Sequence, residues 1–375
     1  MDSILKWIWQ HHDYPSFPYT TERLEERLST LLYTTGKLEG AIMALNDTNL
    51  NGLMIDTAIE EIVKSSEIEG EILSRESVKS SVRKKLDDSF DLTDDSSSHH
   101  TDGLVTLLLD SSEHDKPLTH ARLHSWHAIL FPTGYSDGHK IDVAQYRKHE
   151  MSVVSMKGYR ETVHYVATPP QKVEAEMNKL LEYIEHSSEN PYIKSAIVHL
   201  WFVSIHPYDD GNGRIARTLT NYILSKELGL NHKYYSLSSV IRTERKSYYT
   251  ELEKAQNLFY NRTFTFDAWI LWHSTMIQKA MDFSIFQIQI VIQKTIFWDR
   301  ARAYPLNKRE LKVLNKILDI GIENFEGGLS TKKYAGMTHT SIPTAKRDIS
   351  ELLDYGLIRL VEGSAGRNTR YTLAV

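Results

Sequence analysis

The 375-residue sequence contains no cysteine, which excludes disulfides, thiol catalysis and metal centres built from cysteine ligands. The absence also fits a reducing compartment. The formal net charge is only −5, so the surface as a whole is not expected to attract nucleic acid or an anionic membrane, although a local basic patch can still do so.

Long apolar runs are absent as well. The most apolar segments, such as "SAIVHLWFVSI" at 195–205, are far too short to cross a bilayer. The start, "MDSILKWIWQHHDYPSFPY", lacks the basic region and the uninterrupted apolar region of a signal peptide. We therefore expect a cytoplasmic protein that does not contact membranes.

The composition that remains, 41% hydrophobic and 25% charged residues, is that of an ordinary globular protein long enough for two or three domains. Apolar residues recur mostly at helical spacing. This pattern predicts helices at 20–46, 53–69, 75–86, 118–131, 171–187, 192–205 and 214–228, and further helices to about residue 300. Ser74 is the candidate N-cap of the helix at 75–86. The acidic, serine-rich stretch 87–103 predicts an exposed loop, and β-branched pieces around "KGYRE" predict a short hairpin within 151–170.

The segment "IHPYDDGNGRIARTL" at 205–219 interrupts this helical pattern with polar residues. Pro207 disfavours helical geometry at His206, so one helix should end there. Gly211 and Gly213 leave their backbone uncovered, and their amides can form an anion cradle with the start of the next helix.

The side chains of this segment supply complementary chemistry. Arg214 and Arg217, three residues apart, share a helix face and offer forked donors to phosphate oxygens. Asp210 is a hard oxygen ligand suited to Mg²⁺ held together with phosphates. His206 can accept a proton from a hydroxyl near neutral pH. Together they predict transfer of a phosphate-containing group from a nucleotide to a hydroxyl; the alternative is a polar turn with a capping histidine and solvated arginines.

The same residues resemble a family signature. "HPYDDGNGRIAR" is similar to the Fic motif HPFx[D/E]GNGRxxR, with Tyr208 in place of the usual Phe. The resemblance implies a helical Fic (Fido) core that transfers AMP from ATP to a Ser, Thr or Tyr hydroxyl of a protein. It implies that His206 is the general base, that Asp210 binds Mg²⁺, and that Asn212 and the two arginines hold the phosphates.

Further roles follow only from the resemblance. The hairpin residues Thr162, Val163, His164 and Tyr165 would form a flap that pairs with the target backbone. Tyr248, Tyr249 and Asn257 would line the adenine and ribose, with core aromatics and an exposed Asn as the alternative. Upstream, "SSEIEG" resembles the family's inhibitory element [S/T]xxxE[G/N], with Ser65, Glu69 and Gly70 in the required positions; taken alone, it is an ordinary amphipathic helix end.

The last 70 residues resemble a winged helix-turn-helix domain, with a wing in "RLVEGSAGRNTRYTLA". Near the second helix of that motif, five polar or basic side chains could reach a DNA major groove: Thr340, Ser341, Thr344, Lys346 and Arg347. In the alternative, this domain packs on the core or recruits a protein.

Three histidines remain to be assigned. His120, His124 and His127 fall at i, i+4 and i+7, a spacing that permits metal binding, but no nearby acid completes a site.

The sequence thus predicts a mainly α protein with an N-terminal helical extension (1–100), a Fic core (117–260) with a β-hairpin flap, a helical connector (261–302) and a winged helix-turn-helix (306–375). The predicted function is protein adenylylation with ATP and Mg²⁺, autoinhibited by Glu69, and a homodimer is expected by analogy. The alternatives are a DNA-binding regulator that senses nucleotides, another nucleotide donor, or removal of AMP.

Overall fold

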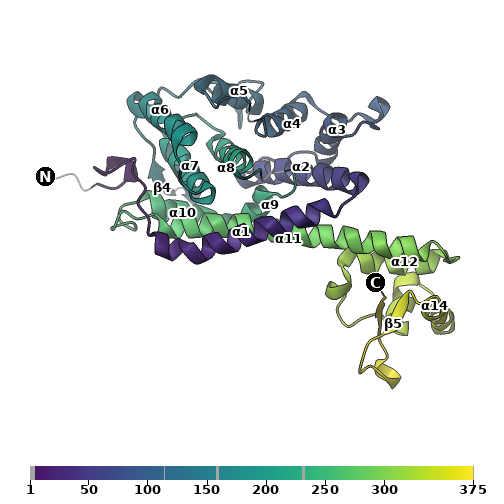
Figure 1. The fold of residues 1–375 in the computed structure, drawn as a ribbon. Helices are drawn as coiled ribbons and strands as arrows, with labels where there is room; N and C mark the ends of the chain where they lie inside the picture. Colours follow the sequence, from purple (N-terminus) through teal and green to yellow (C-terminus); the bar gives the residue numbers. More distant parts are fainter. Residues whose placement is uncertain (1–4, 114, 158–159, 230–232, 375) are drawn as a thin grey trace. The chain divides into compact units, whose positions relative to one another are not determined.

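A computed structural model describes residues 5–113, 115–157, 160–229 and 233–374 (Figure 1). The chain is mainly helical, as predicted. It divides into two compact units, Met1–Ile42 with Asn46–Ser284, and Met43–Leu45 with Ile285–Val375. Within the described residues, no helix combines the length and the apolarity needed to span a membrane.

The first unit begins with a short 3-10 helix and three longer helices: η1 (Ile8–Gln10), α1 (Thr21–Met43), α2 (Asp47–Glu69) and α3 (Arg75–Leu86). The helix α2 starts earlier than predicted because the Asn46 side chain accepts the Asn49 N–H at 2.9 Å. Ser74 caps α3, as predicted, by accepting the Ser77 N–H at 3.3 Å. These two caps fix where α2 and α3 of the N-terminal extension begin.

The prediction of a loop over 87–103 was wrong in its second half. A 3-10 helix, η2 (Leu92–Asp94), is followed by α4 (His99–Asp110). Ser98 is the N-cap of α4 and accepts the Thr101 N–H at 3.1 Å. The run of serines that indicated a loop therefore ends at Ser98, which caps a helix. The helix that follows buries apolar residues such as Leu104 and Val105.

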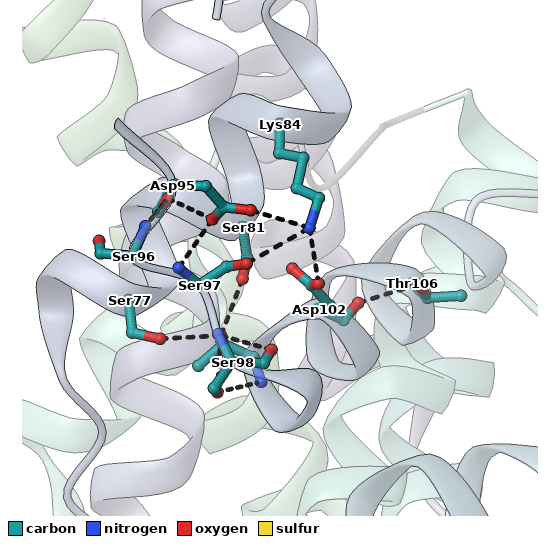
Figure 2. Close-up of polar contacts among 11 residues, drawn as sticks. Ser77, Ser81, Lys84, Asp95, Ser96, Ser97, Ser98, Asp102 and Thr106 are labelled. Atoms are coloured by element: carbon teal, nitrogen blue, oxygen red, sulfur yellow. Dashed lines mark hydrogen bonds and ion pairs between the residues drawn. The ribbon is translucent and has the colours of Figure 1, made fainter. Parts of the chain in front are cut away.

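Polar contacts tie this start of α4 to α3. Figure 2 shows Ser77, Ser81 and Lys84 of α3 facing the segment 95–102. The Lys84 ammonium lies 3.1 Å from the carboxylates of both Asp95 and Asp102. Ser81 is fully buried and donates to the Thr101 hydroxyl at 2.8 Å. The stretch predicted as an exposed loop is thus held in place by a capped helix and by a lysine between two acids.

The centre of the unit is the helix α7 (Pro191–Ile205), which is buried at every residue from Tyr192 onward. It contacts α6 (Pro170–His186) and α8 (Asn212–Leu228), and α8 also contacts α5 (His120–Leu130). All four helices match their predicted ranges to within two residues. The polar segment 205–219 therefore connects two central helices.

Two small hairpins cover this core: β1 (Tyr135–Ser136) with β2 (His139–Lys140), and β3 (Ser152–Lys157) with β4 (Arg160–Val166). The second is the predicted hairpin; positions 158 and 159 of its turn lie outside the described residues. Trp7 packs edge-on against Tyr165 of β4, with ring centroids 5.4 Å apart. The N-terminal segment thereby supports the back of the hairpin.

The remaining helices of the unit are α9 (Leu237–Thr243), α10 (Arg245–Gln256) and the first part of α11 (Asp267–Ala301). The helix α9 packs on α2, and α10 contacts α7 and β4. The inner side of α11 is aromatic, with Trp269 stacked on Trp272 at 5.4 Å. Helices therefore continue to about residue 300, as predicted.

The second unit contains, after α11, three helices, two 3-10 helices and two strands: α12 (Lys308–Ile320), η3 (Ile322–Asn324), α13 (Thr331–Thr338), α14 (Ile342–Asp354), β5 (Ile358–Leu360), η4 (Gly366–Asn368) and β6 (Tyr371–Leu373). The strands β5 and β6 are antiparallel, with Ile358 opposite Leu373. The helices α12 and α14 are strongly amphipathic and bury residues such as Val313 and Leu352. The element order is the one expected for residues 306–375; its assignment as a winged helix stays a prediction.

Candidate functional site

The loop between α7 and α8 contains two residues with left-handed backbone geometry. His206 ends α7 with φ 53° and ψ 60°, in the left-handed region. The following Pro207 disfavours the right-handed helical geometry at this residue, so the helix does not continue. Gly211 precedes α8 with φ 79°, and a Cβ on it would come within 2.8 Å of the Phe131 ring. Glycine is required at 211 for both its conformation and its lack of a side chain.

A buried arginine that the sequence analysis did not identify holds this loop in place. Arg147 is 2% exposed and donates to the carbonyl oxygens of His206 at 2.7 Å, Ile205 at 3.1 Å and His149 at 2.6 Å, and also to that of Thr168. Its position in a coil segment gives no periodic signal. The strained His206 backbone is thus maintained by a guanidinium with four acceptors.

His206 has the protonation state of a base. Its Nδ1 lies 3.2 Å from the Val203 carbonyl oxygen, which can only accept, so Nδ1 carries the hydrogen and Nε2 keeps its lone pair. Burial lowers the pKa of His206, the Val203 carbonyl opposes this, and the charge of Arg147 adds to the lowering. A neutral ring with a free Nε2 lone pair can accept a proton at neutral pH.

The Asn212 side chain braces the loop from inside. Its Oδ1 accepts the Tyr208 N–H at 3.0 Å, and its Nδ2 donates to the Tyr208 carbonyl at 2.8 Å. Tyr208 is fully buried and stacks on His127 with centroids 4.2 Å apart. Asn212 therefore shapes the cradle through its side chain, and a direct phosphate contact by that amide would have to replace one of these bonds.

The three histidines of α5 are occupied by hydrogen bonds. His120 bonds Tyr146 at 2.6 Å through Nδ1 and Asn178 at 2.8 Å through Nε2. Burial lowers the pKa of His127 to about 4, and its neutral ring donates to the Asp210 carbonyl at 3.2 Å and accepts the Ala144 N–H at 3.1 Å. His124 contacts the Tyr208 hydroxyl at 3.0 Å. These rings support the loop.

The two adjacent acids have different surroundings. Asp209 accepts the Asp142 N–H at 2.8 Å and lies 3.5 Å from the His149 ring, so it anchors the neighbouring coil. Asp210 accepts the Gly211 N–H at 2.5 Å and the Ser136 hydroxyl. In the described part of the chain, neither cluster of three close metal-ligand side chains includes Asp210. It can offer one carboxylate, which suits Mg²⁺ when phosphates supply further oxygens.

Arg217 is the most enclosed cation of the site. It is 1% exposed and donates to the Ser65 hydroxyl at 3.1 Å, the Ser65 carbonyl at 2.9 Å and Glu69 Oε1 at 2.8 Å. Burial lowers the pKa of Arg217, but the Glu69 carboxylate, together with Tyr248 and Tyr249, outweighs burial and the pKa is raised. A Cβ at Gly213 would overlap Glu69 Oε1. The end of α2 therefore covers the first turn of α8.

Arg214 has a carboxylate partner too. Its Nη1 lies 2.7 Å from Glu71 Oε2, and its guanidinium lies over the Phe131 ring at 4.8 Å. The sequence analysis did not single out Glu71, which follows Gly70. An acid next to the inhibitory motif was the only available signal, and acids at helix ends are common.

Comparison with known proteins supports the assignment of this core. Residues 117–224 match the family model described as Fic/DOC family. Residues 117–224 form a Fic/DOC family domain. Residues 7–87 match a model described as a domain of unknown function, DUF4172.

A uridine 5′-monophosphate transferase of Xanthomonas campestris pv. campestris (strain 8004) is 29% identical over 123 residues, which cover 31% of this chain and 22% of that protein. The match thus spans about a fifth of the curated relative's length.

Two solved structures share the fold. A Fic family protein from Desulfovibrio desulfuricans G20 is 20% identical with a TM-score of 0.52, covering 96% of this chain and 98% of that one. A Fic domain-containing signalling protein from Bacteroides thetaiotaomicron is 19% identical with a TM-score of 0.51, covering 70% and 97%. At these identities the likeness shows the fold alone.

The residues predicted to form a flap divide into two groups. Thr162 and Val163 are exposed on β4, whereas Tyr165 is 1% exposed and donates its hydroxyl to the Ser204 carbonyl at 2.9 Å. His164 lies at the β-bulge and bonds the Ser155 hydroxyl at 2.7 Å. Only the outer part of the strand can reach a partner, and Tyr165 belongs to the core.

The residues expected beside the adenine also differ in exposure. Tyr248 is buried and bonds His199 through its hydroxyl at 2.9 Å. Tyr249 is 37% exposed, with its hydroxyl 3.4 Å from the Ile68 carbonyl, so it lies beside the end of α2. Asn257 is 7% exposed; its Oδ1 accepts the Phe259 N–H at 2.9 Å. Tyr249 is the member of this set that remains accessible.

Proposed function

We propose that this protein transfers a nucleoside monophosphate, with AMP from ATP as the first candidate, to a hydroxyl of a protein. The supporting observation is the meeting of three elements at one loop: a neutral histidine with a free Nε2, backbone amides at the start of α8, and two arginines one helical turn apart. The relative named as a uridine 5′-monophosphate transferase makes UTP the alternative donor.

The residue roles follow from this chemistry. His206 Nε2 takes the proton of the target hydroxyl, which then attacks the α-phosphorus as pyrophosphate leaves. Asp210 would hold Mg²⁺, which neutralises phosphate charge when bound. Arg214 and Arg217 grip the outer phosphates, and the exposed edge of β4 aligns the target backbone. A homodimer stays a prediction.

We further propose that Glu69 holds the enzyme inactive. Its carboxylate accepts the Arg217 Nη1–H at 2.8 Å, where a γ-phosphate oxygen would bind. A nucleotide bound without that contact places its α-phosphorus out of line with the attacking hydroxyl. The Ser65 contacts to the same guanidinium keep the end of α2 in position.

A second candidate function concerns the last unit. Lys346 and Arg347 are exposed on α14, and neither forms an ion pair with any residue the structure describes. Ser341 caps α14 by accepting the Thr344 N–H at 3.3 Å, and the Ser341 and Thr344 hydroxyls bond each other at 2.9 Å, so both of these hydroxyls are already engaged. We propose weak, salt-sensitive binding of duplex DNA through the basic N-terminal half of α14.

Replacing His206 by Ala is expected to lower nucleotide transfer by ~10²–10⁴-fold while nucleotide binding persists, because amides and arginines form the cradle. The test uses α-labelled ATP and UTP with a cell lysate, in the Glu69→Gly background, and calorimetry for binding. Label incorporation at the parent rate would show that His206 is not the base.

Asp210→Ala is expected to abolish Mg²⁺-dependent transfer even at saturating Mg²⁺, because it removes the proposed ligand. Asp209→Ala should cost less, since it loosens the contact with Asp142 and leaves the ligand in place. Rates measured across a Mg²⁺ titration compare the two variants. Equal losses at every Mg²⁺ concentration would contradict the assignment.

Glu69→Gly is expected to raise auto-modification at least tenfold, about 1.4 kcal/mol of lost inhibition. Adding Arg217→Ala should cancel the gain because the freed fork no longer exists. Glu67→Gly is a matched control, since Glu67 pairs with Lys64 and Arg242 instead. A Glu69→Gly protein no faster than the parent would rule out this inhibitory role.

A Lys346→Glu/Arg347→Glu protein is expected to bind a mixed-sequence 25-base-pair duplex at least tenfold more weakly than the parent at 50 mM salt. Lys312→Glu/Lys316→Glu changes the charge equally on α12 and should bind within about twofold of the parent. Fluorescence anisotropy measures both. Undetectable binding by the parent, or equal binding by the α14 variant, would exclude DNA contact through α14.

A further inference from the structure

The segment that ends α2 carries two acids toward α8. Glu69 pairs with Arg217 and Glu71 pairs with Arg214, at 2.8 Å and 2.7 Å. The Arg214 side chain is only 8% exposed, and its Nη1 donates to Glu71. Both guanidinium groups proposed to hold phosphates are thus neutralised by carboxylates from one short stretch of chain.

Gly70 makes this double contact geometrically feasible. In a continuous helix, residues 69 and 71 would project about 200° apart. Gly70 instead adopts φ 95°, and the Glu71 N–H bonds the Ser66 carbonyl at 3.0 Å, closing the helix end. The chain turns back over α8, so that both carboxylates reach arginines one helical turn apart.

Glu71 is also tied to a different element from the one that carries Glu69. Its Oε1 lies 2.9 Å from His100 Nε2 at the start of α4, while Oε2 faces Arg214. Burial raises the pKa of Glu71, but the His100 hydrogen bond and the Arg214 charge outweigh burial, and the pKa is lowered. Glu71 is therefore ionised at neutral pH and anchored on α4.

We propose that Glu71 is a second carboxylate gate: it competes with nucleotide phosphates for Arg214, separately from the competition of Glu69 for Arg217. The inference rests on the proposed function, because it assigns Arg214 to phosphate binding. A triphosphate oxygen can bind the Arg214 fork only after the carboxylate leaves it. Displacing the end of α2 through Glu69 alone therefore releases only one of the two arginines.

The test measures nucleotide binding without transfer. In the His206→Ala background, the Kd values of ATP and UTP are determined by calorimetry with Mg²⁺ for the parent, Glu69→Gly, Glu71→Gln and the double variant. Glutamine keeps the size of Glu71 and one acceptor oxygen, and removes its charge and its second acceptor. We expect Glu71→Gln to bind at least threefold tighter, and the double variant to show the product of the two gains, because the two acids contact different arginines.

Glu67→Gln is the matched control: it changes the same charge in the last turn of α2 and should leave both Kd values within about twofold. Melting temperatures verify folding, and Glu71→Ala replaces Glu71→Gln if that variant does not fold. Tighter nucleotide binding by the Glu69→Gly variant, with unchanged binding by the Glu71 variants, would overturn the proposed role of Glu71 alone. Absence of nucleotide binding in every variant would overturn the proposed function and this inference with it.

Discussion

The arrangement of the site depends on how the buried guanidinium of Arg217 is compensated by hydrogen-bond acceptors. An arginine that is 1% exposed cannot shed its charge, so it must be surrounded by acceptors. Ser65 supplies a hydroxyl and a carbonyl, and Glu69 supplies a carboxylate. The end of α2 is therefore held on α8 by the need to compensate one cation, and Gly213 leaves the space that the carboxylate requires.

Under the proposed function, the same compensation explains how the inhibited state could be reversed. Phosphate oxygens and carboxylates satisfy a guanidinium with the same forked geometry, so a nucleotide can replace the acids of α2 without leaving a buried charge unpaired. Glu71 pairs with Arg214 in the same way, so under the proposed function nucleotide binding would exchange two intramolecular ion pairs for contacts with a triphosphate. The ion pairs that hold the end of α2 and the affinity for nucleotide would then compete for the same atoms.

The loop that carries His206 is held in place by a different set of contacts. His206 keeps a left-handed backbone because Arg147 donates to its carbonyl oxygen, and because the Asn212 side chain bonds both the N–H and the carbonyl of nearby Tyr208. The neutral His206 ring is oriented by its hydrogen bond to the Val203 carbonyl oxygen in the absence of substrate. Preorganisation of this kind places a base without requiring reorganisation during the reaction.

Several features could be predicted from the sequence alone because they depend on neighbouring residues. Apolar periodicity placed the central helices, Ser74 marked a cap, and the order of proline, acids, glycines and arginines in 206–217 identified the Fic motif. Only the tertiary structure decided that Tyr165 is buried, that Arg147 holds the loop, that 99–110 is a helix, and that Glu71 reaches Arg214. The last contact joins residues 143 positions apart. Contacts at such separations leave no local periodicity, since they depend on how whole helices pack and on which buried charges must find partners.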